Sequence, residues 1–264
     1  MRSSLLSLIR TAAAIALVFG LAGPVLALET LSTPPTKQPG SHFTRSQPGV
    51  RETYIVSFGL FGGESVFESE ARGAAQILSE KLPKAQSLVS FNTKRGGGAT
   101  PRGLEAALKS AGAAMDRDED VLVLALTSHG APQGLAVVAG RRSSVISPRK
   151  LRRMIDASGA RYRIVIISAC YSGVFVPVLA NPHTLVITAA AADRPSFGCA
   201  DGATWTYFGD AFYNQALRHG AKLDAAFVEA KRLVTDREQR EGFKPSEPQI
   251  AGGSLVLGVL SEAN

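Results

Sequence analysis

The stretch "RIVIISACYSGVF", residues 163–175, decides the fold. It begins as a run of mostly β-branched apolar residues without polar alternation, which is typical of a strand buried on both faces of a parallel sheet. The run stops at Cys170, and the small residues after it are typical of a strand end that opens into a loop. Since the chain has only two cysteines in 264 residues, this position indicates either a packing role or a chemical role.

The rest of the chain alternates between strand-like and helix-like segments. A second apolar run, "VLVLALTSHG" at residues 121–130, also ends in a small-residue turn. Further strands are predicted at 53–61, 86–92, 183–190 and 248–260, a hairpin at 134–147, and helices at 64–82, 104–115, 148–158, 205–217 and 223–241. This order predicts a single α/β domain with three layers, a mainly parallel sheet flanked by helices.

Two polar loops lack the pattern of a ligand site. The segment "KRGGGATPRG", residues 94–103, contains neither G-x-G-x-x-G nor G-x-x-x-x-G-K-[ST]. It is therefore predicted to be a connecting loop, with Thr100 as the N-cap of the next helix and Pro101 at its first position. The segment "DRDED", residues 116–120, lacks the calcium-loop pattern and is interpreted as a solvated turn. No cofactor and no metal site are expected.

The N-terminus has the pattern of an export signal. Arg2 and Arg10 accompany an apolar stretch at residues 12–21, and small residues suited to cleavage follow. The predicted segments are a signal peptide (1–27), a flexible linker rich in Pro, Ser and Thr (28–52) and the folded domain (53–264). We therefore expect an exported protein, periplasmic or secreted. An uncleaved membrane anchor is the alternative, because residues 5–28 are long enough to cross a bilayer.

The charge balance argues against a nucleic-acid partner. The chain has 29 basic and 22 acidic residues, a formal charge of +7. Two of the arginines lie in the predicted signal peptide, which leaves 27 against 22, or +5, for the rest. No dense Lys/Arg run is interleaved with aromatic residues, so no nucleic-acid binding is expected.

Reactive side chains follow the two most apolar strands. One strand leads into Thr127–Gly130 and the other into Ser168–Gly173. Because parallel strands end at the same edge of a sheet, His129 and Cys170 are expected to share one crevice. A histidine beside a cysteine suits nucleophilic catalysis, since the thiolate is the reactive form and an imidazole can take its proton. The N–H groups of Gly130 and Cys170 are candidates for an oxyanion hole.

Three motifs together resemble a known family. "TSHG" and "SACYSG" close the two strands, and "TAAAADRPSFGCADGATWTYFGDAF" follows them. They resemble a bacterial-type member of the legumain (asparaginyl endopeptidase) family of cysteine peptidases, which has the caspase–haemoglobinase fold. The resemblance covers roughly residues 54–217. It implies that His129 and Cys170 are a catalytic dyad, and that Ser168, Ser196 and Asp210 line the pocket for the substrate residue before the cleaved bond. In this family that residue is expected to be an asparagine or aspartate.

Several alternatives stay open at this point. Cys170 and Cys199 could form a disulfide, and that bridge would disable the nucleophile. The predicted activity is that of an exported endopeptidase acting on peptides or proteins through a thioester. A transpeptidase of the same chemistry is one alternative. A catalytically inactive member of the fold that binds peptides or a partner is another, and an anchored interaction module is a third.

Overall fold

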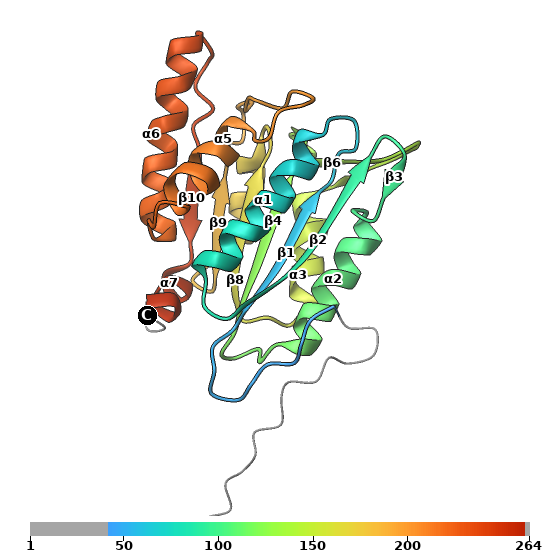
Figure 1. The fold of residues 1–264 in the computed structure, drawn as a ribbon, viewed down its shortest axis with the longest axis vertical. Helices are drawn as coiled ribbons and strands as arrows, with labels where there is room; N and C mark the ends of the chain where they lie inside the picture. The colour runs from blue at the N-terminus through green and yellow to red at the C-terminus, as the bar shows by residue number, and fades with distance from the viewer. Residues whose placement is uncertain (1–41, 262–264) are drawn as a thin grey trace, which may run out of the picture. The chain divides into compact units, whose positions relative to one another are not determined.

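The computed structural model describes residues 42–261. Its centre is a sheet of seven strands: β1 (Thr53–Gly59), β2 (Ala85–Thr93), β3 (Gly96–Gly97), β4 (Val121–Thr127), β8 (Tyr162–Ser168), β9 (Thr184–Thr188) and β10 (Gln249–Gly252). Their order is β10-β9-β8-β4-β1-β2-β3 (Figure 1). The five inner strands are parallel, and β3 and β10 at the two edges are antiparallel to their neighbours. The expected mainly parallel sheet is confirmed.

Helices cover both faces of this sheet. One face carries α1 (Val66–Lys81), α5 (Tyr207–Gly209), the π-helix η2 (Asp210–Leu217), α6 (Leu223–Glu241) and α7 (Ser254–Ser261). The other carries α2 (Pro101–Ala114), α3 (Pro148–Asp156), the short η1 (Ser172–Phe175) and α4 (Val176–Leu179). Figure 1 shows α1 and α2 on opposite faces of the strands. The fold is the expected three-layer α/β arrangement.

The continuous apolar runs explain why the central strands lie between two helical layers. In β4, Val121 and Val123 pack into one core, while Leu122 and Leu124 pack into the other. Successive side chains of a strand point to opposite faces, so a strand without polar alternation buries both. Each fully buried Val or Leu side chain contributes about 1.5–3 kcal/mol, which makes this sandwich the main source of stability.

The order of strands creates a topological switch point between β1 and β4. From β1 the chain first builds β2 and β3 on one side, and then β4, β8 and β9 on the other. In open parallel sheets, the loops that leave the carboxyl ends of the strands diverge at such a point and leave a crevice. The loops after β1 and β4 flank this crevice, and the loop after β8 lies next to it.

A small antiparallel sheet follows β4 directly. It consists of β5 (Gly130–Ala131), β6 (Gly134–Ala139) and β7 (Arg142–Ile146), in that order. The hairpin predicted at 134–147 corresponds to β6 and β7. Both predicted helix starts are confirmed: Thr100 and Ser147 accept the N–H groups of Gly103 and Lys150 with their side chains, and a proline follows each.

The last predicted strand is wrong in its second half. The sequence predicts a strand over 248–260, but β10 ends at Gly252 and the helix α7 begins at Ser254. Gly252 and Gly253 both have positive φ, 74° and 76°, which ends the extended conformation. Val256 is then buried from a helix rather than from a strand.

Two polar segments are less solvated than the sequence predicts. Asp120, at the end of the expected solvated turn, is fully buried. Its carboxylate accepts the N–H groups of Glu52 and Asp116, at 2.8 and 2.7 Å. The expected flexible linker extends to residue 52, yet Phe43 is only 1% exposed and stacks edge-on against Tyr54. The last ten residues of the predicted linker, 43–52, therefore belong to the folded part of the chain.

The predicted signal peptide and the first part of the linker lie outside the described residues. Among residues 42–261, no helix is both long enough and apolar enough to cross a membrane.

Candidate active site

The strand register brings the loops of His129 and Cys170 together. Thr127 at the end of β4 pairs with Ser168 at the end of β8, and Ser128 donates its N–H to the Ser168 carbonyl at 3.1 Å. His129 and Cys170 each follow two residues beyond this pair. Gly130 packs so tightly that a Cβ atom there would overlap the carbonyl oxygen of Cys170. The two loops are therefore in direct backbone contact.

The His129 side chain is held at the mouth of the crevice. Its Nε2 lies 3.3 Å from Glu64 Oε2, and the His129 side chain is 36% exposed. The rings of Phe61 and Phe67 stand edge-on to the imidazole, with centroids 4.6 and 5.0 Å away. The aromatic contacts restrict the ring plane, and the carboxylate engages one of the two ring nitrogens. The other nitrogen stays available for a proton-transfer partner.

The Cys170 thiol is a free, half-buried group. Its Sγ accepts the N–H of Ser196 at 3.2 Å and donates to the carbonyl of Ser196 at 3.3 Å. No hydrogen bond joins Cys170 to His129 in the described part of the chain. Catalytic hydrogen bonds are often long before substrate binds, so this geometry is compatible with a dyad. The next residue, Tyr171, has φ +56°, a strained conformation for a non-glycine residue that is common where a reactive side chain is exposed.

Both expected oxyanion donors have N–H groups that bond to no other described residue. Gly130 faces Leu135 across β5 and β6, and the bond from Ala136 N–H to the His129 carbonyl makes this a non-hydrogen-bonded pair. The Gly130 N–H is therefore outside the ladder. Cys170 lies just past the end of β8, and its N–H makes no backbone hydrogen bond to residues 42–261.

The three expected pocket residues have different positions. Ser196 touches the Cys170 sulfur through its backbone, and its Oγ lies 4.0 Å from that sulfur. Ser168 is 2% exposed and hydrogen-bonds to Thr206 Oγ1 at 2.9 Å, so it lies beneath the crevice rather than in its wall. Asp210 is half-buried, and its carboxylate accepts the side-chain amides of Asn214 and Gln215, each at 2.7 Å.

The second cysteine is also reduced. Cys199 is half-buried, and no disulfide joins it to Cys170. Burial, with smaller contributions from the charges of Cys170, Glu70 and Glu64, raises the pKa of the Cys199 thiol to about 12. Cys199 is therefore a thiol at neutral pH and a poor nucleophile.

Two carboxyl groups of the site were not found from the sequence. Glu64 comes from the loop after β1 and contacts His129. Glu70, on α1, is fully buried and accepts the Thr206 N–H at 2.8 Å. A signal for Glu70 was present, because it lies three residues after Phe67 and four before Ala74 on the buried stripe of α1. Glu64 lies in an irregular loop, where no hydrophobic periodicity distinguishes a buried or functional position from its neighbours.

A cleft of about 420 Å³ lies beside His129. It is lined by the loop after β1, the end of β2 and Asp201. Glu64 lines the cleft and also contacts His129. Lys94 and Asp201 form an ion pair at 3.1 Å in its wall, and Asp201 also accepts the Ser65 N–H. The cleft is open to solvent, and most of its lining residues are polar or charged. Among residues 42–261, no group of three side chains is arranged to hold a metal ion.

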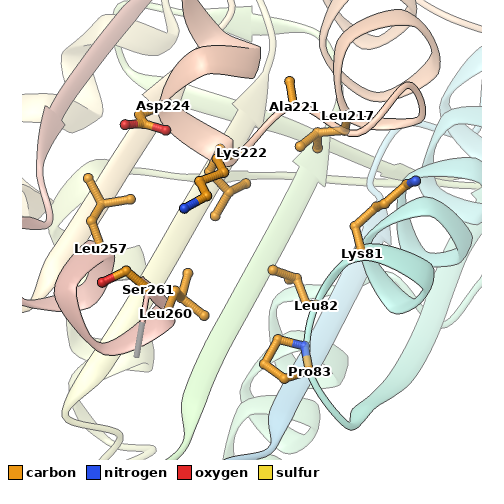
Figure 2. A pocket seen from close by; sticks show the side chains of 11 residues that line it. Lys81, Leu82, Pro83, Leu217, Ala221, Lys222, Asp224, Leu257, Leu260 and Ser261 are labelled. Atoms are coloured by element: carbon orange, nitrogen blue, oxygen red, sulfur yellow. The ribbon is translucent and has the colours of Figure 1, made fainter. Parts of the chain in front are cut away.

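A second cavity, with several leucines in its lining, lies at the other edge of the sheet. It has a volume of about 220 Å³ and is formed where α1 ends, between Leu82 and the helix α7. Figure 2 shows Leu257 and Leu260 on one side of it and Leu82 and Pro83 on the other, with Lys222 between them. None of the expected site residues lines this cavity.

Comparisons with known proteins identify the family and the fold of the chain. A family model described as the peptidase C13 family matches residues 102–256, which include His129, Cys170, Ser196 and Asp210. Among solved structures, the chain is similar to caspase-1 from Spodoptera frugiperda, with a TM-score of 0.53 and 13% sequence identity. The match covers 82% of this chain and 91% of the caspase chain, and at this identity it shows the fold alone. A search of curated protein sequences gave no match.

Proposed function

The chain belongs to the peptidase C13 family, the legumain family of cysteine peptidases, and on this premise we propose that Cys170 and His129 form its catalytic dyad. The chain is a cysteine peptidase with a caspase-like fold. The observation that supports the dyad is the register of β4 and β8, in which Thr127 pairs with Ser168 and His129 and Cys170 each follow two residues later.

In the first half of the reaction, the thiol of Cys170 loses its proton to His129, and the sulfur attacks the carbonyl carbon of the scissile peptide bond. The C=O π electrons move to the oxygen, where the N–H groups of Gly130 and Cys170 would stabilise the negative charge. When the tetrahedral intermediate collapses, the C–N bond breaks and His129 gives its proton to the departing amine. The products of this step are the free amine and a thioester on Cys170.

In the second half, His129 takes a proton from a water molecule as the water oxygen attacks the thioester carbonyl. The C–S bond then breaks, the carboxylic acid leaves, and the thiol of Cys170 is restored. Glu64 supports both halves, because its carboxylate at 3.3 Å from Nε2 holds the orientation of the imidazole ring. An amine in place of water would give transpeptidation by the same steps.

The site also supports a proposal about the substrate. The polar cleft beside His129 suits an extended peptide, and cleavage after asparagine or aspartate remains the specificity we propose from the family. Ser196 is the expected pocket residue that contacts the sulfur, so it is placed to meet the residue before the cleaved bond. Export through the N-terminal segment is proposed from its sequence alone.

A peptide-library digest tests this function. The purified chain and its Cys170→Ala variant are incubated with peptides that differ at each position around the cleaved bond, with and without reductant, and products are read by mass spectrometry. We expect cleavage at one class of residue by the wild type and none by the variant. Equal cleavage by both would overturn the dyad. Binding of peptides without cleavage by either protein would support the inactive, peptide-binding alternative.

A further inference from the structure

One buried carboxyl group connects all the elements that carry the proposed site. Glu70, on α1, is 1% exposed and lies under the carboxyl edge of the sheet. Its Oε2 accepts the N–H of Thr206 at 2.8 Å. Gly209 packs against the same carboxyl so closely that a Cβ atom there would overlap Oε2. The group therefore has no room to adopt another position.

The hydroxyl groups around Glu70 belong to the strands of the dyad. Ser168 and Thr127 close β8 and β4, each two residues before Cys170 and His129. The third hydroxyl, that of Thr206, accepts the Gly209 N–H at 2.9 Å, which leaves its own proton for Ser168 or Glu70. Ser168 reaches the carboxyl through its bond to Thr206, Thr127 lines the same narrow void as Glu70, and the three hydroxyl groups lower the pKa of the carboxyl.

The main contributions to the electrostatics of this group are burial and neighbouring hydrogen-bond donors rather than a lysine, arginine or histidine. Burial raises the pKa of Glu70, and the hydroxyls of Ser168, Thr206 and Thr127 oppose that increase. Among residues 42–261, Glu70 Oε1 and Thr127 Oγ1 have no hydrogen-bond partner, and both residues line a void too narrow for a water molecule. A buried carboxyl without a cation is costly, so a purely structural purpose would be served better by an apolar side chain.

We propose that Glu70 is a positioning residue of the peptidase, which fixes the relative placement of the ends of β4 and β8 and thereby of His129 and Cys170. The proposal rests on the proposed dyad. Because Glu70 is buried beneath the two strand ends, it acts through Thr127 and Ser168 and does not touch the substrate. Its effect should therefore appear in kcat, where the alignment of nucleophile and base matters, and much less in KM.

The first test compares kcat and KM of Glu70→Gln with those of the wild type, on a peptide chosen from the library digest. The carboxamide has nearly the same size, but one of its two oxygens becomes a donor that faces hydroxyl and amide donors. We expect kcat to fall about tenfold, with KM within about twofold. Unchanged kcat in a folded variant would overturn the proposal.

A second pair of variants separates positioning from general damage. Gly209→Ala keeps the carboxyl but displaces it, so it should lower kcat as Glu70→Gln does. Ser168→Ala removes the link to β8, and the double variant of Ser168→Ala with Glu70→Gln should lose no more activity than the more affected single variant. Losses that multiply independently would contradict a shared positioning role.

Glu238 offers a matched control. It is also 1% exposed, its Oε2 accepts a backbone N–H at 2.9 Å, from Ser246, and its Oε1 has no partner. It lies on α6, and its bond goes to Ser246 rather than to the end of β4 or β8. Glu238→Gln should leave kcat within about twofold of the wild type. An equal loss in both variants would mean that any buried glutamate has this effect.

A last readout keeps this inference separate from the dyad itself. If Cys170→Ala retains activity, the proposed dyad fails, and peptide cleavage no longer reports on Glu70. The rate of Cys170 alkylation by iodoacetamide then decides, because it depends on the environment of the sulfur and not on turnover. We expect Glu70→Gln to change this rate by at least about threefold, and an unchanged rate would overturn the positioning role.

Discussion

A carboxyl group is buried at both the amino edge of the central sheet, where the parallel strands begin, and the carboxyl edge, where they end. Its contacts differ between the two. At the amino edge, both oxygens of Asp120 accept backbone N–H groups, and the nearby side chains of Tyr54, Glu52 and Gln86 bond to one another. At the carboxyl edge, Glu70 accepts one backbone N–H and otherwise faces hydroxyl groups. The first arrangement closes a turn, whereas the second connects separate strands.

The difference also extends to the side chains above each carboxyl. Near Asp120, backbone N–H groups bond to both carboxylate oxygens and Tyr54 bonds to Glu52, and neither cysteine of the chain is among these partners. Above Glu70, a half-buried cysteine and a 36% exposed histidine stand at adjacent strand ends. A buried carboxyl alone therefore does not mark a functional site. A partly exposed pair of reactive groups, supported from below, is what distinguishes the carboxyl edge.

The contrast between the two edges would be wrong if peptidase activity survived without the sulfur of Cys170. Cys170→Ala should lower kcat/KM by at least about 10⁴-fold, because the nucleophile is lost. Since Cys170 is half-buried and its replacement is smaller, the fold should stay intact. Circular dichroism and peptide cleavage check both points. Residual activity within tenfold of the wild type would mean that the catalytic residues do not lie at the carboxyl edge.

Gly130→Ala tests whether close contact between the two loops is needed. The new methyl group would overlap the Cys170 carbonyl oxygen, so the loops must separate. A displacement of about 1 Å between reacting groups costs on the order of 10²-fold in rate, and the strain should cost about 1–3 kcal/mol of unfolding free energy. Kinetics and urea unfolding measure the two effects. A fully active variant would show that the contact is incidental.

Asp120→Asn tests the amino edge. Its side-chain amide would face a backbone N–H, so the free energy of unfolding should fall by about 1–3 kcal/mol, with kcat unchanged. Burial raises the pKa of Asp120. The protonated form is therefore favoured on folding, and its stabilising contribution is lost as the pH rises through the raised pKa. The stability gap between wild type and variant should narrow from acidic to neutral pH, and a gap that widens would contradict this sign.

Glu64→Gln should have the smallest effect. The pair with His129 is exposed, at 36% and 30% for the two side chains, and an ion pair of this kind contributes about 1 kcal/mol or less. We expect kcat to fall by only about two- to fivefold. KM, measured alongside, should stay within about twofold. A loss beyond 10²-fold would make Glu64 an essential third member of the site.

The sheet and its helices could be predicted because their signals are local. Apolar runs such as 121–127 and 162–168 reveal strands buried on both faces, and proline after Ser or Thr marked two helix starts. The closing strand failed because "SLVLGVL" is too short and uniformly apolar to distinguish strand from helix. Only the left-handed Gly252–Gly253 pair separates β10 from α7.

The candidate site could be predicted only in part, for a related reason. His129 and Cys170 follow recognisable strands, and the order of parallel strands predicts that their ends meet. Glu64 and Glu70 approach from the loop after β1 and from α1, and no pattern within their own segments indicates that contact. Ser168 was expected in the pocket, but its side chain bonds to Thr206 beneath the crevice. Alternation along β8 places it on the same face as Ile164 and Ile166. Contacts between distant segments needed the folded structure.

The central claim is that His129 and Cys170 work as a pair, and the pH dependence of Cys170 alkylation tests it most directly. Iodoacetamide is applied to the wild type and to His129→Ala, and the modified cysteine is identified by mass spectrometry. Cys199, with its pKa raised to about 12, should stay unmodified at pH 8 and serves as an internal reference. We predict that the alkylation rate of Cys170 depends on pH differently in the wild type and in the variant that lacks the imidazole. Identical profiles in the two proteins would contradict the pairing.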